Sequence, residues 1–321
     1  MYDVSIIIPI YNTSKYIQQC AISLFEQDYD NIEYIFINDC TQDNSMEILN
    51  NIIQQYPNRK NDIKIINHTI NQGSGIARKD GILAASGEYT IQIDSDDWVE
   101  LDMISSFMKA ARLADADIVV SDLYINSKNR EIYINQDFSS YINPSNKLSY
   151  LKSILSHYIL PSLCNKLIKK EIYTKINFSE FSFAEDWYLN IQMFYYSNKI
   201  AYINKAFLHY RRVNGSSITT KKSQRLIIDH INFNKQSFSF LNEKQVLQEV
   251  REDFYIGLFK SIVSISNIKI TKEIKNICPE CFKPKYVLKN KKFGILKKII
   301  YLTIFIDSGF IYNLSRRLYV A

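Results

Sequence analysis

Long hydrophobic runs are missing from this 321-residue sequence, and glycine and proline are scarce. The longest apolar stretch, Ile299–Ile306, has eight residues, whereas a membrane-spanning helix needs about 20, so no transmembrane helix is predicted. Only 8 Gly and 6 Pro exclude collagen-like and linker-rich architectures. With 46% hydrophobic and 22% charged residues, a disordered chain is excluded too, and the length favours about two domains.

Cysteine is also scarce, which excludes a disulfide-rich scaffold. The odd count of five, without a recognisable signal peptide, predicts a reducing cytoplasmic location. Cys278 and Cys281 form an isolated C-P-E-C pair. Because structural zinc usually needs four ligands, we interpret this pair as two free thiols in a turn.

The net charge of +6 is unevenly distributed along the chain. Residues 283–321 contain nine basic residues and one acidic residue, a net +8, which leaves −2 for the rest. The tail at 285–321 mixes these charges with Ile, Leu, Phe and Tyr, as in a basic amphipathic segment that lies on an anionic membrane. A helix packed back on the protein is the alternative. Nucleic-acid binding is not predicted, because no recognised module is present.

Strand and helix signals alternate through the first 125 residues. We expect strands at 4–8, 33–38, 62–67, 89–94 and 118–123, and helices after an N-cap at Ser14 and at 43–56, 74–85 and 100–114. This spacing indicates βαβ units, hence an α/β fold with a mainly parallel sheet. After about residue 140 helices dominate, at 148–158, 185–196 and within 223–265, with a strand at 199–204.

Polar clusters follow the predicted strands, where ligands of parallel sheets bind. The sharpest cluster is D-S-D-D, from Asp94 to Asp97, which puts three carboxylates in four residues. Such carboxylates repel one another and raise their own pKa values, and a hard cation such as Mg²⁺ or Mn²⁺ would offset that repulsion. An acidic turn in which Asp97 caps the next helix is the alternative.

Four further segments accompany the acidic cluster. They are V-S-I-I-I-P-I-Y-N at 4–12, F-I-N-D-C-T-Q-D-N-S at 36–45, N-Q-G-S-G-I-A-R at 71–78 and A-E-D-W at 184–187. In order and spacing, the five segments resemble those of family 2 glycosyltransferases of the bacterial surface-polysaccharide type. The segments at 165–170 and 210–218 are also similar to that family. Cys40 replaces a usual glycine in the second segment, which changes the turn but removes no catalytic group.

The resemblance implies a GT-A fold, Rossmann-like with a mainly parallel central sheet, followed by a helical C-terminal region. The expected catalytic domain is 1–220, with a nucleotide-sugar half at 1–125 and an acceptor half at 126–220, and the helical region is 221–321. The implied enzyme is an inverting, metal-dependent hexosyl- or N-acetylhexosaminyl-transferase. It would move one sugar from a UDP-sugar to a hydroxyl of a surface glycan, such as a lipid-linked capsule, lipopolysaccharide or exopolysaccharide unit, at the inner face of the plasma membrane.

The resemblance also assigns the chemistry to particular side chains. Asp186 is the expected base, and Glu185 would bind the acceptor or raise the pKa of Asp186. Plain charge complementing a helix N-terminus is the alternative for both residues. Asp96 would hold Mn²⁺ or Mg²⁺, with Asp94 on the metal or ribose side. His209 is a third candidate ligand, although a lone histidine beside apolar residues is more often structural.

A second group of residues is expected to contact the nucleotide sugar. It consists of Pro9, Tyr11, Asn12, Asp39, Asn71, Arg78, Asp94, Ser95 and Arg211. In this group Asp39 would bind the base, and Arg211 a phosphate or the acceptor. For Arg78, a nucleotide contact and a structural ion pair are equally weighted.

Other enzyme classes agree less well with the sequence. A dinucleotide fingerprint would need a third glycine where Arg78 stands, and no Walker A loop is present. Processive synthases add transmembrane helices and a Q-x-x-R-W motif, both missing here. A catalytically inactive nucleotide-sugar- or membrane-binding protein of the same fold is the remaining alternative, and retention of Asp94, Asp96 and Asp186 argues against it.

Overall fold

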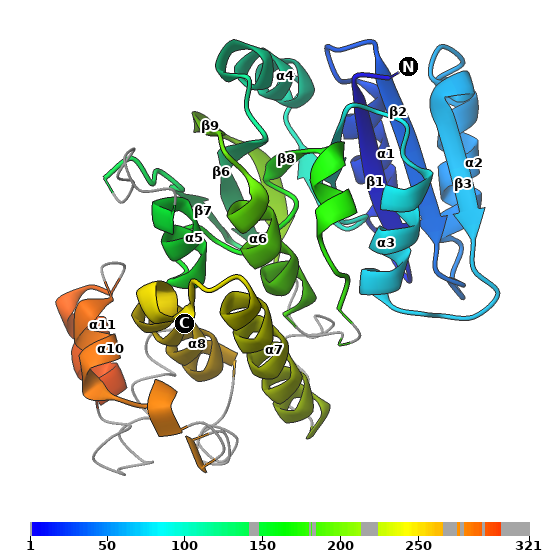
Figure 1. Ribbon diagram of the computed structural model, residues 1–321. Coiled ribbons are helices and arrows are strands. Elements are labelled where there is room, and N and C mark those ends of the chain that lie inside the picture. The colour runs from blue at the N-terminus through cyan, green and yellow to red at the C-terminus, as the bar shows by residue number, and fades with distance from the viewer. Residues whose placement is uncertain are drawn as a thin grey trace. The chain divides into compact units, whose positions relative to one another are not determined.

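A computed structural model describes residues 2–140, 148–179, 181, 184–212, 224–265, 275–276, 279–290 and 293–302. The chain divides into two compact units. Unit 1 comprises Met1–Asp137 and Ser162–Asn214, and unit 2 comprises Phe138–Pro161 and Gly215–Ala321. Unit 1 holds the sheet and unit 2 is helical in its described part (Figure 1).

Unit 1 begins with the predicted alternation of strands and helices. Its first half contains β1 (Val4–Ile10), α1 (Ile17–Phe25), β2 (Ile32–Asn38), α2 (Ser45–Gln55), β3 (Ile63–Asn67), α3 (Ser74–Ala84) and β4 (Tyr89–Gln92), with a 3-10 turn at Lys60–Asp62. Its second half contains β5 (Trp98–Val99), α4 (Met103–Ala114), β6 (Ile118–Ser127), β7 (Arg130–Ile134), β8 (Lys166–Lys169), a 3-10 turn at Lys170–Lys175, α6 (Glu185–Tyr196) and β9 (Ile200–Arg211).

These strands form one nine-stranded sheet in the order β3-β2-β1-β4-β8-β6-β9-β5, with β7 paired to β6. β3, β2, β1 and β4 run parallel, as do β6 and β9, whereas β8 lies antiparallel between the two groups. The expected α/β class with a mainly parallel sheet is confirmed. The strands β5, β7 and β8 were not predicted; β5 has only two residues, which carry no alternation that could reveal a strand.

Helices cover both faces of the parallel strands. Phe25 of α1 makes edge contacts with Tyr34 and Phe36 of β2. On α3, a Cβ added at Gly81 would lie only 2.4 Å from a side-chain carbon of Ile7, so only glycine allows this close approach. Successive strand residues point to opposite faces, and therefore α1 and α3 pack on opposite sides of the sheet.

One predicted helix boundary is wrong. Ser14 does not cap α1, which begins at Ile17 after Tyr16. The N–H of Ser14 instead donates to Oδ2 of Asp43 at 2.9 Å, in the loop after β2. The helix begins three residues after Ser14, so the side-chain oxygen of Ser14 is not at the cap position.

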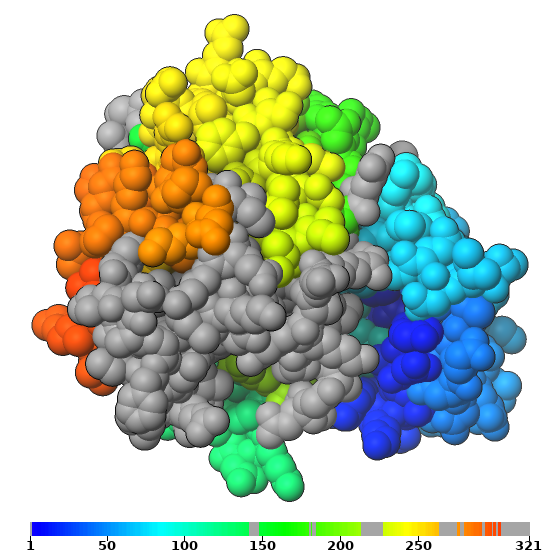
Figure 2. Space-filling model, turned by 90° about the horizontal axis from the view of Figure 1, so that it is seen from below, coloured from blue at the N-terminus to red at the C-terminus, as the bar shows by residue number. Residues whose placement is uncertain are grey.

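Unit 2 contains α5 (Leu148–Leu155), α7 (Gln224–Glu243), α8 (Leu247–Ile265), a 3-10 turn at Pro279–Cys281, α10 (Pro284–Lys289) and α11 (Ile295–Leu302). α8 is its centre, since α5, α7 and α10 all pack on it. Figure 2 shows the orange atoms of α10 beside the yellow atoms of this helical unit.

This packing on α8 explains why residues 138–161 belong to unit 2, although the sequence analysis assigned them to an acceptor half at 126–220. Among the described residues, no helix is long and apolar enough to cross a membrane. Cys281 is buried, while Cys278 and the tail beyond residue 302 lie outside the described residues.

Candidate active site

A hydrogen bond joins the loops after β1 and β2 beside residues that were predicted to bind a nucleotide sugar. Asn12 has a φ of 54°, and its N–H donates to Oγ1 of Thr41 at 2.8 Å. Tyr11 beside it is exposed, whereas Pro9 lies within β1, opposite Ile37. Asn12 and Tyr11 therefore lie at the surface of the loop, whereas Pro9 is a residue of the strand that leads into it.

Asp39 directly follows β2 and is almost fully buried, at 2% exposure. Its Oδ1 accepts the N–H of Gln72 and its Oδ2 that of Gly73, both at 2.8 Å. Nδ2 of Asn71 donates to the carbonyl oxygen of Asp39 at 3.3 Å. Asp39 and Asn71 thus hold the loop before α3 against the end of β2.

His68 is a contact of Asp39 that the sequence analysis missed. Its Nδ1 lies 2.8 Å from Oδ1 of Asp39, and its Nε2 lies 3.0 Å from Oδ2 of Asp80. His68 thus contacts the same Oδ1 of Asp39 that accepts the N–H of Gln72, and it helps to orient this carboxylate. The sequence offered no signal for this role, because His68 lies outside the matched segments.

Cys40 has a φ of 56°, in the left-handed region that favours glycine. This backbone conformation accounts for the glycine that the family resemblance would place here. A non-glycine residue in this region costs about 1–2 kcal/mol, and Cys40 carries that strain without altering the hydrogen bonds of Asp39.

The three carboxylates of the acidic turn have different environments. Asp97 is 1% exposed, and its Oδ1 accepts the N–H of Arg211 at 2.7 Å, which ties the turn to the end of β9. Burial, followed by the charges of Asp94 and Asp96, raises the pKa of Asp97 well above its usual range. Asp97 does not cap a helix, because α4 begins only at Met103.

Asp94 and Asp96 remain as the carboxylates available to a ligand. The side chain of Asp94 is 30% exposed, and burial together with the charge of Asp94 raises the pKa of Asp96 to about 6. A divalent cation would offset this repulsion, and two carboxylates plus substrate phosphates are a common Mg²⁺ environment. The described residues contain no set of three or more His, Cys, Asp or Glu that would hold a metal alone. This pair therefore agrees with an open site completed by a diphosphate.

The side chain of Ser95, between these two aspartates, is not exposed to a ligand. It is buried, and its Oγ accepts a hydrogen bond from Oγ1 of Thr13 at 3.1 Å. Its contribution is to attach the acidic turn to the loop after β1.

Arg78 of α3 links the acidic turn to α6. Its Nη2 lies 2.6 Å from Oδ1 of Asp94, and its Nη1 lies 3.0 Å from Oε1 of Glu185. The guanidinium is nearly buried, so these ion pairs are little screened by solvent. In this structure Arg78 is an ion-pair partner of both carboxylates, as the structural alternative expects, and its contact with the nucleotide stays a prediction.

Glu185 and Asp186 form the first turn of α6. Burial, followed by the charge of Asp186, raises the pKa of Glu185 to about 7. Burial raises the pKa of Asp186 as well, against the opposing charges of Arg78 and Lys166. A carboxyl with a raised pKa is a stronger base when ionised, which is the property a proton acceptor near neutral pH needs.

Arg211 is held rigidly beside the acidic turn. Its Nε donates to the carbonyl oxygen of Asp96 at 2.8 Å, and its Nη2 to Oε1 of Gln19 at 2.6 Å. The guanidinium also stacks between the rings of Tyr16 and Trp98, at 4.8 and 4.5 Å from their centroids. Arg211 is thus a fixed cation beside the acidic turn, and its contact with a phosphate or the acceptor stays a prediction.

His209 does not complete the metal site in this structure. Its Nε2 lies 2.7 Å from Oε1 of Glu100 and its Nδ1 lies 3.3 Å from Oδ1 of Asn126. Its ring is stacked between Trp98 and Tyr124, each at 4.7 Å. Because both nitrogens are already engaged, we remove His209 from the metal ligands and assign it to this aromatic stack.

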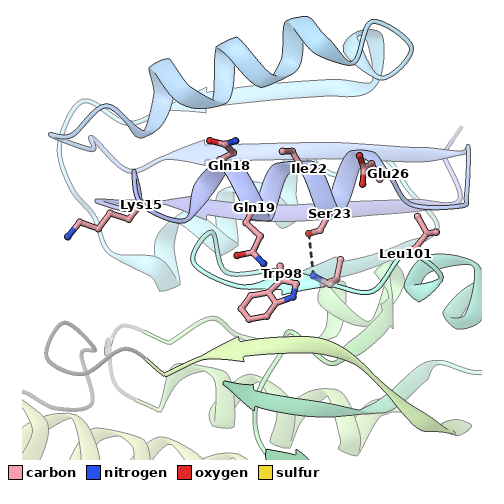
Figure 3. A pocket seen from close by; sticks show the side chains of 9 residues that line it. Lys15, Gln18, Gln19, Ile22, Ser23, Glu26, Trp98 and Leu101 are labelled. Carbon is pink, nitrogen blue, oxygen red and sulfur yellow. Dashed lines mark hydrogen bonds between the residues drawn. The ribbon is translucent and has the colours of Figure 1, made fainter. Parts of the chain in front are cut away.

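A pocket of about 490 Å³ opens between α1 and the β5 segment (Figure 3). Lys15, Gln18, Gln19, Ile22 and Trp98 are among its lining residues. It contains none of the predicted site residues, but Gln19 and Trp98 also hold Arg211. The pocket therefore lies next to the side chains that hold Arg211 in place.

Comparison with known proteins agrees with this arrangement. The sequence model of glycosyl transferase family 2 matches residues 5–176. The putative glycosyltransferase EpsH of Bacillus subtilis is 28% identical over 304 residues, which cover 91% of this chain and 86% of EpsH. S. aureus TarS in complex with UDP has a similar structure, with a TM-score of 0.66 and 17% identity over 99% of this chain and 91% of that chain.

Two further structures show what related folds bind. S. aureus TarS has also been solved with UDP-GlcNAc, at a TM-score of 0.59 and 17% identity over 99% of this chain and 91% of that one. Mannosyltransferase PcManGT from Pyrobaculum calidifontis, in complex with GDP-Man and Mn²⁺, has a TM-score of 0.50 and 12% identity over 96% of this chain and 87% of that one.

The fold and the acidic strand-end site define a glycosyltransferase of the GT-A class. Within that class, the chain belongs to glycosyl transferase family 2, whose model matches more than half of its length. The family that the sequence segments resemble is thereby confirmed, and the A-E-D-W segment at 184–187 lies beyond the matched residues.

Proposed function

We propose that this enzyme transfers a single sugar from a UDP-sugar to a hydroxyl group of a surface glycan, with inversion at the anomeric carbon. The observation that carries the proposal is the Arg78 bridge, which joins Asp94 of the acidic turn to Glu185, the neighbour of Asp186. A diphosphate bound at the acidic turn and an acceptor hydroxyl at α6 would then be adjacent, as direct displacement requires.

In this mechanism Asp186 accepts the proton of the acceptor hydroxyl while that oxygen attacks the anomeric carbon. The bond between the anomeric carbon and the diphosphate oxygen breaks, and UDP leaves with the electron pair. Glu185, whose pKa is raised to about 7, is paired with Arg78 and would position the acceptor by accepting a hydrogen bond from one of its hydroxyl groups. Attack from the face opposite UDP inverts the configuration.

The donor side rests on the acidic turn and on the corner around Asp39. Asp94 and Asp96 would hold Mn²⁺ or Mg²⁺, which supplies positive charge to the departing diphosphate. Arg211 adds a fixed cation, and Asp39, Asn71 and the loop after β1 would bind the nucleotide. The UDP and UDP-GlcNAc complexes of TarS support a uridine donor, and hexosyl or N-acetylhexosaminyl transfer is proposed on the same ground.

The acceptor is proposed to be a lipid-linked unit of a capsule, lipopolysaccharide or exopolysaccharide at the inner face of the plasma membrane. The basic region 285–321 would hold the enzyme there. In its described part, Ile295, Leu296 and Ile299 of α11 are exposed, on the same helix as Lys298. Exposed apolar residues beside lysine are what a peripheral membrane helix presents.

An assay of purified protein with a panel of UDP- and GDP-sugars and Mn²⁺ tests the proposed donor class. We expect nucleotide release with one UDP-sugar, loss of that activity with EDTA and its return with Mn²⁺ or Mg²⁺. Activity that survives EDTA in metal-free buffer would contradict the metal proposal. A panel negative throughout would favour a catalytically inactive nucleotide-sugar-binding protein.

A vesicle-binding measurement tests the proposed tail. The double variant Ile295→Asp/Ile299→Asp should sediment less with anionic vesicles, because it loses apolar burial and gains repulsion. Ile228→Asp, at an exposed position on α7, is the matched control and should bind as the parent does. Equal binding of both variants would show that α11 does not contact the membrane.

A further inference from the structure

His68 is a histidine with a buried side chain that the proposed mechanism does not use. It directly follows β3, and its backbone N–H donates to the carbonyl oxygen of Asn38 at 2.9 Å, at the end of β2. Its side chain is only 5% exposed and lies between two carboxylates. Nδ1 lies 2.8 Å from Oδ1 of Asp39, and Nε2 lies 3.0 Å from Oδ2 of Asp80 on α3. Contacts on both nitrogens therefore fix the orientation of the ring.

The carboxylate of Asp39 is left with little capacity for further hydrogen bonds. Each oxygen of an ionised carboxylate can accept about two hydrogen bonds and can donate none. Oδ1 of Asp39 contacts both the N–H of Gln72 and Nδ1 of His68, each at 2.8 Å. Oδ2 accepts the N–H of Gly73. Counted over the described residues, one acceptor position remains, on Oδ2.

A single remaining acceptor position can distinguish between nucleotide bases. N3 of uracil carries a hydrogen and can donate it to a carboxylate, whereas N3 of cytosine carries none and is itself an acceptor. A site built to hydrogen-bond a substrate N–H rejects the analogue that lacks it, because a buried polar group is then left unpaired. This selection needs a carboxylate whose oxygens stay in place, and His68 occupies the second position of Oδ1.

We propose that His68 is a positioning residue that fixes the carboxylate of Asp39, so that Asp39 selects a nucleotide base with an N–H group, as in uracil, over a base without one, as in cytosine. This inference rests on the proposed function, in which Asp39 binds the nucleotide. It adds a residue that determines the specificity for a uridine donor. Asp80 contributes indirectly, since its contact with Nε2 keeps Nδ1 of His68 directed to Asp39.

Calorimetric titration with UDP and with CDP, in the presence of Mn²⁺, tests this selection. His68→Phe should bind UDP about tenfold more weakly and CDP as the parent does, because Asp39 loses one of its donors. His68→Asn, whose amide nitrogen can replace Nδ1, should keep most of the preference for UDP. His230→Phe, the same replacement at a buried position of α7, is the matched control and should keep both parent affinities.

Kinetics separate positioning from a general loss of structure. With the identified donor, His68→Phe should raise the donor KM about tenfold and leave kcat at saturating donor unchanged, since Asp39 would contact the base and not the reacting atoms. Affinities for UDP and CDP that fall equally, or a kcat that falls with them, would overturn the inference and leave His68 a structural residue. An unchanged affinity for UDP would overturn it too.

NMR of the histidine rings gives a measurement that does not depend on the folding of His68→Phe. The chain has only 4 histidines, and His68→Asn assigns the signal of His68. Asp39→Asn should move the Nδ1 signal of His68, because the ring loses a charged partner, and UDP should move it more than CDP at equal saturation. A signal that stays in place in Asp39→Asn, or in the parent with UDP bound, would overturn the inference alone. If the parent binds no UDP, the proposed uridine donor fails and the base selection fails with it.

Discussion

Replacement of Asp186 by asparagine is expected to abolish sugar transfer and leave donor binding intact. Asparagine has nearly the same shape and can still accept the N–H of Trp187, which donates to Oδ1 of Asp186 at 2.8 Å. It cannot take up a proton, and loss of a general base lowers kcat by about 10²–10⁴-fold. The measurements are kcat with the identified donor and acceptor, and the dissociation constant of the donor by calorimetry.

Asp115→Asn is the matched control for this experiment. Asp115 is exposed and paired with Lys199 on the surface, so the same chemical change should alter neither kcat nor donor affinity. Turnover by Asp186→Asn at the parent rate would exclude Asp186 as the base. A loss of donor binding in that variant would instead assign Asp186 to the donor site.

Replacement of Arg78 by methionine is expected to have the largest effect on stability. The change leaves Asp94 and Glu185 without their shared cation, and removing one partner of a buried ion pair costs about 3–5 kcal/mol. Transfer should fall as well, because the acidic turn and α6 lose their link. Urea denaturation gives the free energy of unfolding, and activity is measured below the transition.

Arg112→Met provides the comparison for Arg78→Met. Arg112 pairs with Asp3 at 2.7 Å, but its side chain is 58% exposed, so water screens the interaction. Surface pairs of this kind contribute about 0–1 kcal/mol. If the two variants lose similar stability, the Arg78 bridge is not a buried link between the two carboxylates.

The alternation of strands and helices could be read from the sequence because it is a local property. β1, β2 and α3 lie within two residues of their predicted bounds, since their apolar residues recur with the period of each element. The placement of Asn12, Asp39 and Asp94 at the ends of parallel strands follows from the same pattern. β5, which supports the site through Trp98, could not be predicted, because two residues carry no period.

The roles of individual charged residues could be predicted only in part. The sequence offered Asp97 only as a possible cap of the next helix, whereas the structure buries Asp97 and lets it accept the N–H of Arg211, and α4 begins only at Met103. His209 was a candidate ligand until its two nitrogens were found to contact Glu100 and Asn126. Both outcomes depend on partners that lie more than 80 residues away along the chain.

By itself, the sequence determined the fold class, the family and the strand ends at which chemistry is concentrated. These follow from local periodicity and from short segments whose order along the chain is visible. Only the tertiary structure decided that Arg78 joins Asp94 to Glu185, and that the two ring nitrogens of His209 contact Glu100 and Asn126. Pairing and desolvation depend on which distant elements pack together, and they set the charge of each group.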